Sequence, residues 1–308
     1  MELNEELGNG TEELAESSTE ALEMIENTSN IEEISPACPT CSNGKEEING
    51  KDYTNYIYAM GKIEPRFPSL AIEKEFAQIV SRMDAKGMTD QQTMHSVLSK
   101  KENRYIARRI CWVMTIEGLE TYILKPRDPG DLDLLLEAIR PGSSRNDLDM
   151  VIGILGPIAS PDMCNGLMVP IVFFDQIYSF DVDSLIKSIP RPEKKTAKDF
   201  ETAANELFER IMQMADNAGA TDEHRAMNYL SVRYPAIYAV ASQEFERNCS
   251  LSSIEVITSR LSGMRKIMDV IFTYTNRETD VAQKFFVRVD VTEEFPFLVT
   301  KMSPYYDR

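Results

Sequence analysis

Histidine, tryptophan and cysteine are scarce in this sequence. Its 308 residues include two His, one Trp and five Cys. The histidines, His95 and His224, lie in predicted helices among polar neighbours, and neither belongs to an HExxH metal motif or accompanies a GxSxG serine motif. The sequence also has no phosphate-binding P-loop and no dinucleotide-binding glycine motif. These absences predict no recognisable catalytic site.

Positive charge is also in short supply. The chain has 33 Lys and Arg against 50 Asp and Glu, a net charge of -17. Residues 1–50 hold thirteen Glu and one Lys, a net charge of -12, which leaves -5 for the other 258 residues. Such a chain cannot neutralise phosphates efficiently, so we expect no nucleic-acid binding. Residues 1–35 are rich in Glu, Ser, Thr and Asn, which predicts an acidic disordered tail or linker, or alternatively a segment that folds on a partner.

A secretion signal and long apolar runs are missing too. The first residues are acidic and contain no apolar signal-peptide core. Residues 150–174 carry one charge, Asp162, but three prolines and three glycines interrupt them, which favours two buried strands over a membrane-spanning helix. Five cysteines without a disulfide-framework spacing favour a reducing compartment. We therefore expect a cytoplasmic protein that does not bind membranes.

The apolar pattern predicts an α+β fold in which strands and helices come in runs. The first half should contain strands at 53–60, 151–158 and 167–174, an extended segment at 63–68, helices from Ser69 to about Ala85 and over 90–100, 131–139 and 181–188, and a β-hairpin over 105–125. The second half should contain helices over 197–217, 222–233 and 235–248, followed by an antiparallel β region with strands over 253–259, 266–275 and 281–291. The segment 191–195 has the composition of a linker, so residues 36–308 form one domain with predicted subdomains 36–190 and 191–308.

The most specific local motif is the pair Cys38 and Cys41 in the sequence CPTC. Two thiolates at this spacing can hold one zinc ion, which usually takes four ligands. The other two could come from a second copy across a dimer, or from Cys111, Cys164 or Cys249 together with a histidine. A redox-active pair and a turn without function are the alternatives. We predict a structural zinc site.

Two arginines lie between prolines with acidic residues close by. Arg66 is in the sequence EPRFP and Arg127 in PRDPGD. A guanidinium fixed in this way can bind the carboxylate of a peptide or a partner. An internal ion pair that locks the loop is the simpler interpretation. Arg66 and Arg127 are therefore candidate anchor residues for binding.

Three segments together resemble a known family. They are ACPTC at 37–41, YAMGKIEPRFPSL at 58–70 followed by EKEF at 73–76, and VDVTEEFPFLVTKMSPYYDR at 289–308. This pattern resembles the C-terminal domain of unknown function of PatG-type cyanobactin maturation proteases, which also occurs in the PatA-type partner. In that family the domain follows a subtilisin-like protease that trims or macrocyclises ribosomally made precursor peptides. The present chain contains no Asp/His/Ser subtilase motifs, so we expect a stand-alone chain without the protease domain.

The resemblance implies an accessory role in the biosynthesis of ribosomally made, cyanobactin-like modified peptides. It transfers no catalytic residue. We expect a non-catalytic domain that binds a biosynthetic enzyme or a precursor peptide, forms a homodimer and uses zinc, if any cofactor, structurally. The alternative is a peptide-modifying enzyme that depends on a cysteine or a bound metal.

Overall fold

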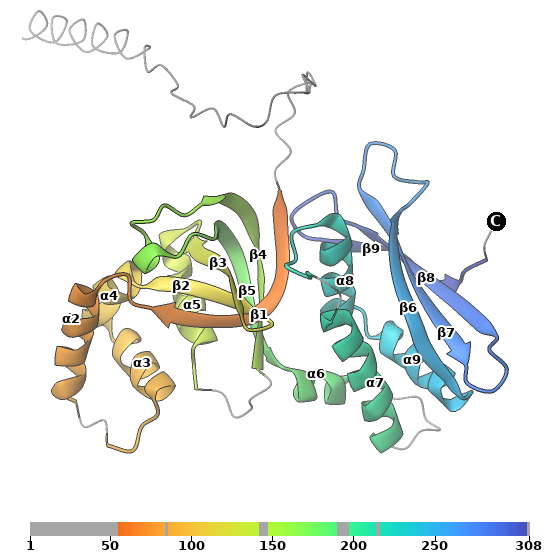
Figure 1. Ribbon diagram of the computed structural model, residues 1–308, viewed down its shortest axis with the longest axis horizontal. Helices are drawn as coiled ribbons and strands as arrows, with labels where there is room; N and C mark the ends of the chain where they lie inside the picture. Colours follow the sequence, from red (N-terminus) through yellow and green to blue (C-terminus); the bar gives the residue numbers. More distant parts are fainter. Residues whose placement is uncertain (1–54, 84–85, 142–146, 190–196, 214–215, 307–308) are drawn as a thin grey trace, which may run out of the picture. The chain divides into compact units, whose positions relative to one another are not determined.

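The computed structural model describes residues 55–83, 86–141, 147–189, 197–213 and 216–306. The chain divides into two units, Met1–Asp52 and Tyr53–Arg308, and all described residues belong to the second. This unit contains a closed barrel and a separate four-stranded sheet, together with helices (Figure 1). The predicted α+β class is confirmed. None of the described helices is long and apolar enough to cross a membrane.

The first half folds into the barrel. Its strands are β1 (Tyr56–Arg66), β2 (Cys111–Ile116), β3 (Leu119–Pro126), β4 (Asp147–Ile158) and β5 (Pro170–Asp181), closed in the order β1-β2-β3-β5-β4. All neighbouring pairs are antiparallel except β3 and β5, which are parallel. Between the strands lie α2 (Leu70–Ser81), α3 (Asp90–Leu98), α4 (Arg104–Arg109) and α5 (Leu132–Ala138). Short 3-10 turns precede α4 and α5, and a third lies between β4 and β5 at Cys164–Gly166.

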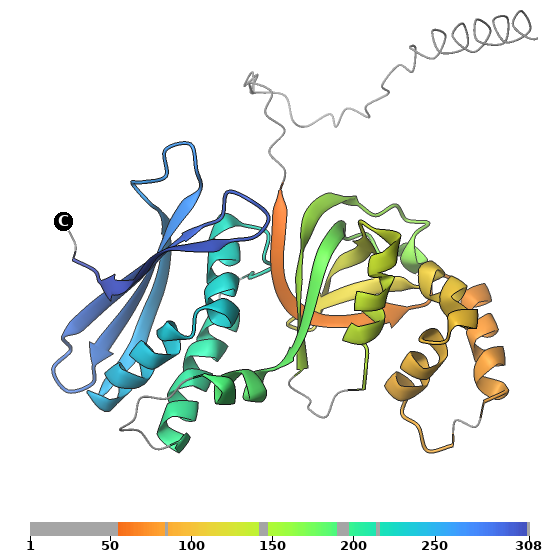
Figure 2. The same cartoon turned by 180° about the vertical axis from the view of Figure 1, so that it is seen from behind.

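The second half places helices on one side of an antiparallel sheet (Figures 1 and 2). The helices are α6 (Val182–Ser188), α7 (Ala197–Met212), α8 (Asp222–Arg233) and α9 (Ala236–Glu246). The sheet follows in the order β6 (Cys249–Thr258), β7 (Ile267–Asn276), β8 (Ala282–Asp290) and β9 (Phe297–Pro304). Buried side chains of α7, α8 and α9 form one apolar core with alternate residues of β7 and β8.

Strand β1 belongs to both cores because its side chains alternate between two faces. Ile57 and Ala59 are buried inside the barrel core, whereas Tyr58 and Met60 are buried against the helices of the second half. The Tyr58 amide donates a hydrogen bond to the Gly219 carbonyl at 2.9 Å. Gly219 has φ +71°, and a Cβ there would come within 2.4 Å of the Tyr58 carbonyl oxygen. Only glycine therefore allows this close approach before α8.

Asn228 of α8 completes the connection to β1. Its side-chain amide donates to the Tyr58 carbonyl at 2.8 Å. The same side chain exchanges two hydrogen bonds with Asn217, at 2.8 and 3.1 Å. Both asparagines are buried, so these bonds satisfy polar groups that have left water. The two halves are thus joined by a specific polar contact as well as by apolar packing.

Several predicted elements differ from the observed ones. Residues 105–109, predicted as part of the hairpin, belong instead to helix α4, and Ile110 caps its end. Ile106, Ala107 and Ile110 share one buried face, which favours the helix. The helix predicted to reach Ala85 ends at Ser81. Strand β9 was not predicted. The tail 1–35 and the linker 191–195 lie outside the described residues.

Candidate functional site

The predicted zinc pair, Cys38 and Cys41, lies outside the described residues. Within the part of the chain that the structure describes, no three His, Cys, Asp or Glu side chains are grouped so that they could hold a metal ion. The zinc site therefore stays a prediction.

Cys111 and Cys164 form a disulfide, which corrects their role as potential zinc ligands. The bond joins the first residue of β2 to the connection between β4 and β5. Cys249 is a free, buried cysteine. The expectation of a reducing compartment depended on the lack of a disulfide framework, and this bond removes that argument.

Arg66, a predicted anchor, forms an ion pair with Glu120 of β3. Both side chains line a small pocket of about 430 Å³, beside Cys164. This is the internal pair expected as the simpler interpretation.

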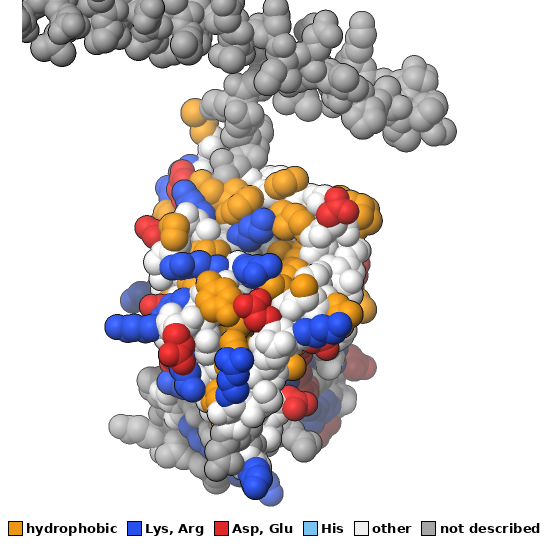
Figure 3. Space-filling view, turned by 90° about the vertical axis from the view of Figure 1, so that its left-hand side faces the viewer, with side chains coloured by type: hydrophobic (Ala, Val, Ile, Leu, Met, Phe, Trp, Pro, Cys, Tyr) orange, Lys and Arg blue, Asp and Glu red, His pale blue; other side chains and the backbone are white. Residues whose placement is uncertain are grey.

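Neighbouring helices add further cations, and Figure 3 shows Lys and Arg side chains spread between hydrophobic ones over the face that carries α2 and α4.

Arg127, the second predicted anchor, lies between two carboxylates. Its Nη1 atom donates to Asp175 Oδ2 at 2.6 Å and lies 3.5 Å from Glu294 Oε2. Burial and the neighbouring Asp175 carboxyl raise the pKa of Glu294 to about 7. Asp175 belongs to β5 and Glu294 to the β8–β9 connection, so Arg127 links the barrel to the C-terminal sheet. Its guanidinium already has internal partners.

Arg225 of α8 binds the same β8–β9 connection through backbone carbonyls. The side chain is almost fully buried, and it donates to the carbonyls of Val291 at 2.6 Å, Glu293 and Glu294. Its guanidinium also lies 5.3 Å from the ring centre of Tyr56 on β1. Sequence patterns gave no signal for this residue, because its partners are backbone carbonyls.

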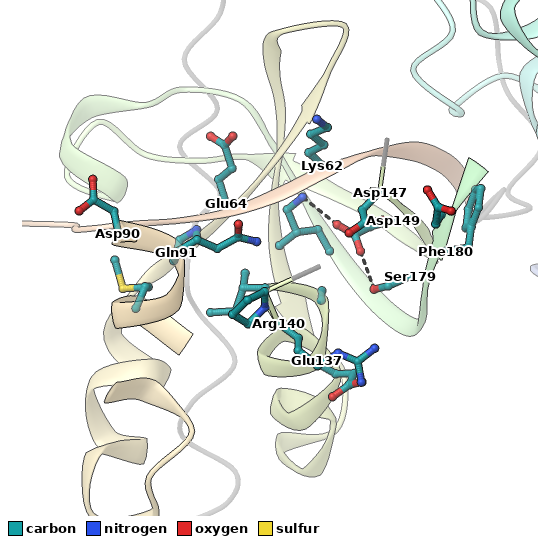
Figure 4. A pocket seen from close by; sticks show the side chains of 17 residues that line it. Lys62, Glu64, Asp90, Gln91, Glu137, Arg140, Asp147, Asp149, Ser179 and Phe180 are labelled. Atoms are coloured by element: carbon teal, nitrogen blue, oxygen red, sulfur yellow. Dashed lines mark hydrogen bonds and ion pairs between the residues drawn. The ribbon is translucent and has the colours of Figure 1, made fainter. Parts of the chain in front are cut away.

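A pocket of about 1120 Å³ lies at one end of the barrel. Five elements contribute to it: the last residues of β1, the N-terminal half of α3, the end of α5 with the residues that follow, the start of β4 and the end of β5. The charged side chains that line it are Lys62, Glu64, Asp90, Glu137, Arg140, Asp147, Asp149 and Asp181. Six of these residues carry carboxylates and two carry cations, and Arg140 is paired with Glu137 at 2.6 Å. Figure 4 shows Asp149 and Ser179 turned toward each other, whereas the Lys62 and Glu64 side chains extend from the opposite side of β1.

Asp149 is the buried carboxylate of this pocket, with 7% of its surface exposed. Its Oδ2 accepts the Ile63 amide at 3.0 Å, and its Oδ1 accepts the Ser179 hydroxyl at 2.6 Å, as the dashed lines of Figure 4 show. Burial raises the pKa of Asp149 to about 6, although the two hydrogen bonds partly oppose this shift. Burial thus moves the pKa of Asp149 about two units above that of an ordinary aspartate.

The pocket offers a ligand carboxylates together with apolar side chains. The described residues that line it include neither His nor Cys, and the Ser179 hydroxyl is already bound to Asp149. His224 lies elsewhere, on α8, where burial lowers its pKa. A carboxylate-rich pocket with apolar side chains such as Ile139 and Phe180 can hold a cationic side chain together with its aliphatic stem.

Comparison with known proteins agrees with this architecture. Residues 194–305 match the family model described as PatG C-terminal. Among solved structures, the one titled "PatG Domain of Unknown Function" has the same fold, with a TM-score of 0.66 and 21% sequence identity. The match covers 82% of this chain and 99% of that chain. No curated protein gives a significant match.

These findings define the class of the protein as an α+β domain with the PatG C-terminal fold. The resemblance predicted from the sequence, to the C-terminal domain of unknown function of PatG-type proteins, is confirmed.

Proposed function

We propose that this chain is a non-catalytic binding domain in a PatG-like pathway that makes cyanobactin-type modified peptides. It acts as a homodimer, and the carboxylate-rich pocket of the barrel takes a cationic segment of a precursor peptide or of a biosynthetic enzyme. The family match and the shared fold support the pathway, and the pocket supports the binding role.

One observation carries the proposal: a pocket of about 1120 Å³ whose lining residues include six carboxylates, two cations and several apolar side chains. Small-molecule pockets typically measure about 300–1,000 Å³, so this one has room for a peptide segment. Its polar side chains come from several elements of a closed barrel, which holds them in fixed positions. Lysine or arginine side chains match its charge.

The alternative, an enzyme that uses a cysteine or a bound metal, would depend on Cys38 and Cys41. Cys111 and Cys164 are bonded to each other, and Cys249 is buried. A structural zinc ion held by Cys38 and Cys41, shared between two copies, stays part of the proposal. This shared zinc site is tested by measuring the zinc content per purified chain together with the mass of the protein in solution.

A charge-matched pair of peptides tests the pocket. Fluorescein-labelled peptides of alternating Lys and Gly, or of alternating Glu and Gly, are titrated with the full chain and followed by fluorescence anisotropy. We expect the Lys peptide to bind and the Glu peptide not to bind. The variant Asp147→Asn should weaken binding about fivefold, because an exposed charge pair contributes up to about 1 kcal/mol.

The matched control neutralises two exposed carboxylates outside the pocket, Glu117→Gln on the β2–β3 turn and Glu209→Gln on α7. It should bind the Lys peptide as the parent chain does. Equal binding of the two peptides, or an equal loss in the control variant, would contradict the proposed site.

A further inference from the structure

The connection between β4 and β5, which Figure 1 shows in green, packs on the outer wall of the barrel. We call its residues 159–169 the strap. Side chains of a strand alternate between two faces, so β2, β3 and β5 each send a buried apolar residue away from the barrel interior: Val113, Ile123 and Ile171. The strap covers these residues with apolar side chains of its own: Ala159, Met163, Leu167 and Val169. The result is a small apolar core, separate from the barrel interior.

Hydrogen bonds hold the strap together but do not tie it to the wall. Among the described residues, the backbone hydrogen bonds of 160–167 close turns within the strap itself. The Ala159 amide donates to the Val169 carbonyl at 2.9 Å, which closes the base of the loop. The contacts that attach the strap to the wall are therefore apolar ones and one covalent bond, the disulfide between Cys111 and Cys164.

The disulfide also holds a strained turn. Cys164 has φ +48°, Asn165 φ +55° and Gly166 φ +86°, so three successive residues are in the left-handed region. Glycine adopts this conformation readily, whereas other residues do so at a cost in free energy. The Asn165 side chain is exposed, so it adds little packing that could offset this cost. Breaking the disulfide lets the turn relax, and this relaxation favours release of the strap.

A small pocket gives a reductant a way to reach the disulfide. The pocket has a volume of about 430 Å³, and Cys164 lines it together with Asn165 and Gly166. Arg66 and Glu120 lie on its opposite side, in the barrel strands β1 and β3. The pocket thus leads to the Cys164 end of the bond.

We propose that the disulfide between Cys111 and Cys164 is a redox switch, which keeps the strap on the barrel wall when oxidised and releases it when a dithiol reduces it. One thiolate of the dithiol attacks the Cys164 sulfur to form a mixed disulfide, and Cys111 leaves as a thiolate. The second thiolate of the dithiol then displaces Cys164. Two electrons and two protons pass to the protein, which ends with two thiols, while the dithiol becomes a disulfide.

Release of the strap changes the surface of the barrel. It uncovers Val113, Ile123 and Ile171, beside Ile158 and Met168, which are exposed already. The reduced chain therefore presents an apolar surface that the oxidised chain lacks, and surfaces of this kind mark interaction sites. The described residues that line the large pocket at the end of the barrel include none of the strap, so the switch is independent of the proposed peptide binding.

A redox titration tests the role of the strained turn. The full chain is equilibrated with dithiothreitol at increasing ratios of reduced to oxidised form and then alkylated, and mass spectrometry follows the peptides that contain Cys111 and Cys164. Asn165→Ala should be reduced at a ratio about fivefold lower than Asn165→Gly, because the left-handed conformation costs alanine more than glycine. Asn248→Ala makes the same change at another residue with positive φ, far along the chain, and should keep the midpoint of the parent.

Amide hydrogen exchange measures the release itself. In the reduced parent chain, exchange over 159–169 should become about tenfold faster or more, whereas β7 should still exchange slowly. The variant Cys111→Ser with Cys164→Ser should match the reduced parent chain, and dithiothreitol should not change it. A reduced chain that keeps the strap as protected as before, or that loses the protection of β7 as well, would overturn the proposal. Equal midpoints for Asn165→Gly and Asn165→Ala would overturn it too.

Discussion

The buried carboxylate Asp149 makes stability depend on pH in a direction opposite to that of a salt-bridged aspartate. The perturbation is Asp149→Asn, which keeps the size of the side chain. The amide oxygen can still accept the Ile63 amide, and the amide group can still bond to the Ser179 hydroxyl. The variant therefore removes the titration while changing the packing little.

The magnitude follows from the pKa, which burial raises from 3.8 to about 6. One unit corresponds to about 1.4 kcal/mol, so the shift represents about 3 kcal/mol. Between pH 4 and pH 6 the folded chain keeps the Asp149 proton that the unfolded chain has already lost. Since the folded state binds more protons, the free energy of unfolding falls as the pH rises through this range.

The assay is urea unfolding of the parent chain and of Asp149→Asn at pH 4, 5, 6 and 7. The variant-minus-parent difference in unfolding free energy should grow by about 2 kcal/mol from pH 4 to pH 7, because at pH 4 the unfolded chain has already lost part of the Asp149 proton. Contributions from other groups, Glu294 among them, cancel in this difference. Asp133→Asn, an exposed carboxylate on α5, serves as the control and should show no comparable trend. A variant-minus-parent difference that is constant with pH would refute the reasoning.

Two further predictions concern covalent and buried contacts. Replacing Cys111 and Cys164 together by Ser opens a loop with a sequence separation of 53. This should lower the free energy of unfolding by about 4 kcal/mol, which thermal unfolding measures. A reductant should lower the melting temperature of the parent chain to that of the variant and leave the variant unchanged. Arg225→Met keeps the apolar stem but leaves the carbonyls of Val291, Glu293 and Glu294 without their donors, at a cost of about 3 kcal/mol. Faster amide hydrogen exchange over 291–296 in the Arg225→Met variant, with unchanged exchange in β2, would support this role of Arg225. Unchanged exchange in the β8–β9 connection would contradict it.

The sequence was most informative where one face of an element is buried. Apolar periodicity predicted the helix over 222–233 and the first three strands of the C-terminal sheet, because burial on one face leaves a repeating pattern. Helix α4 was misjudged since Ile106, Ala107 and Ile110 fit a strand and a helix equally well over so short a segment. Strand β9 was missed because its outward side chains, Phe297 and Val299, are apolar too and hide the alternation.

The candidate site was harder to predict than the fold. Asp149 lies in a sequence with 50 acidic residues, and only the barrel brings it together with Ile63 and Ser179. Its one local signal is its position directly before the apolar run from Met150, inside a strand. Closure of the barrel also depends on the parallel pairing of β3 with β5, which no short-range pattern specifies.

The two roles of β1 have a consequence for the order of folding. During synthesis Tyr58 is added to the chain early, whereas Asn228, whose side-chain amide binds the Tyr58 carbonyl, is added 170 residues later. Pairing of β1 with β4 is also distant, since Tyr56 lies opposite Ile154. A chain that emerges from the ribosome must therefore keep one side of its first strand exposed until α8 has been synthesised. Such long-range contacts slow folding, so the late arrival of α8 sets the moment at which the barrel gains its final polar contact.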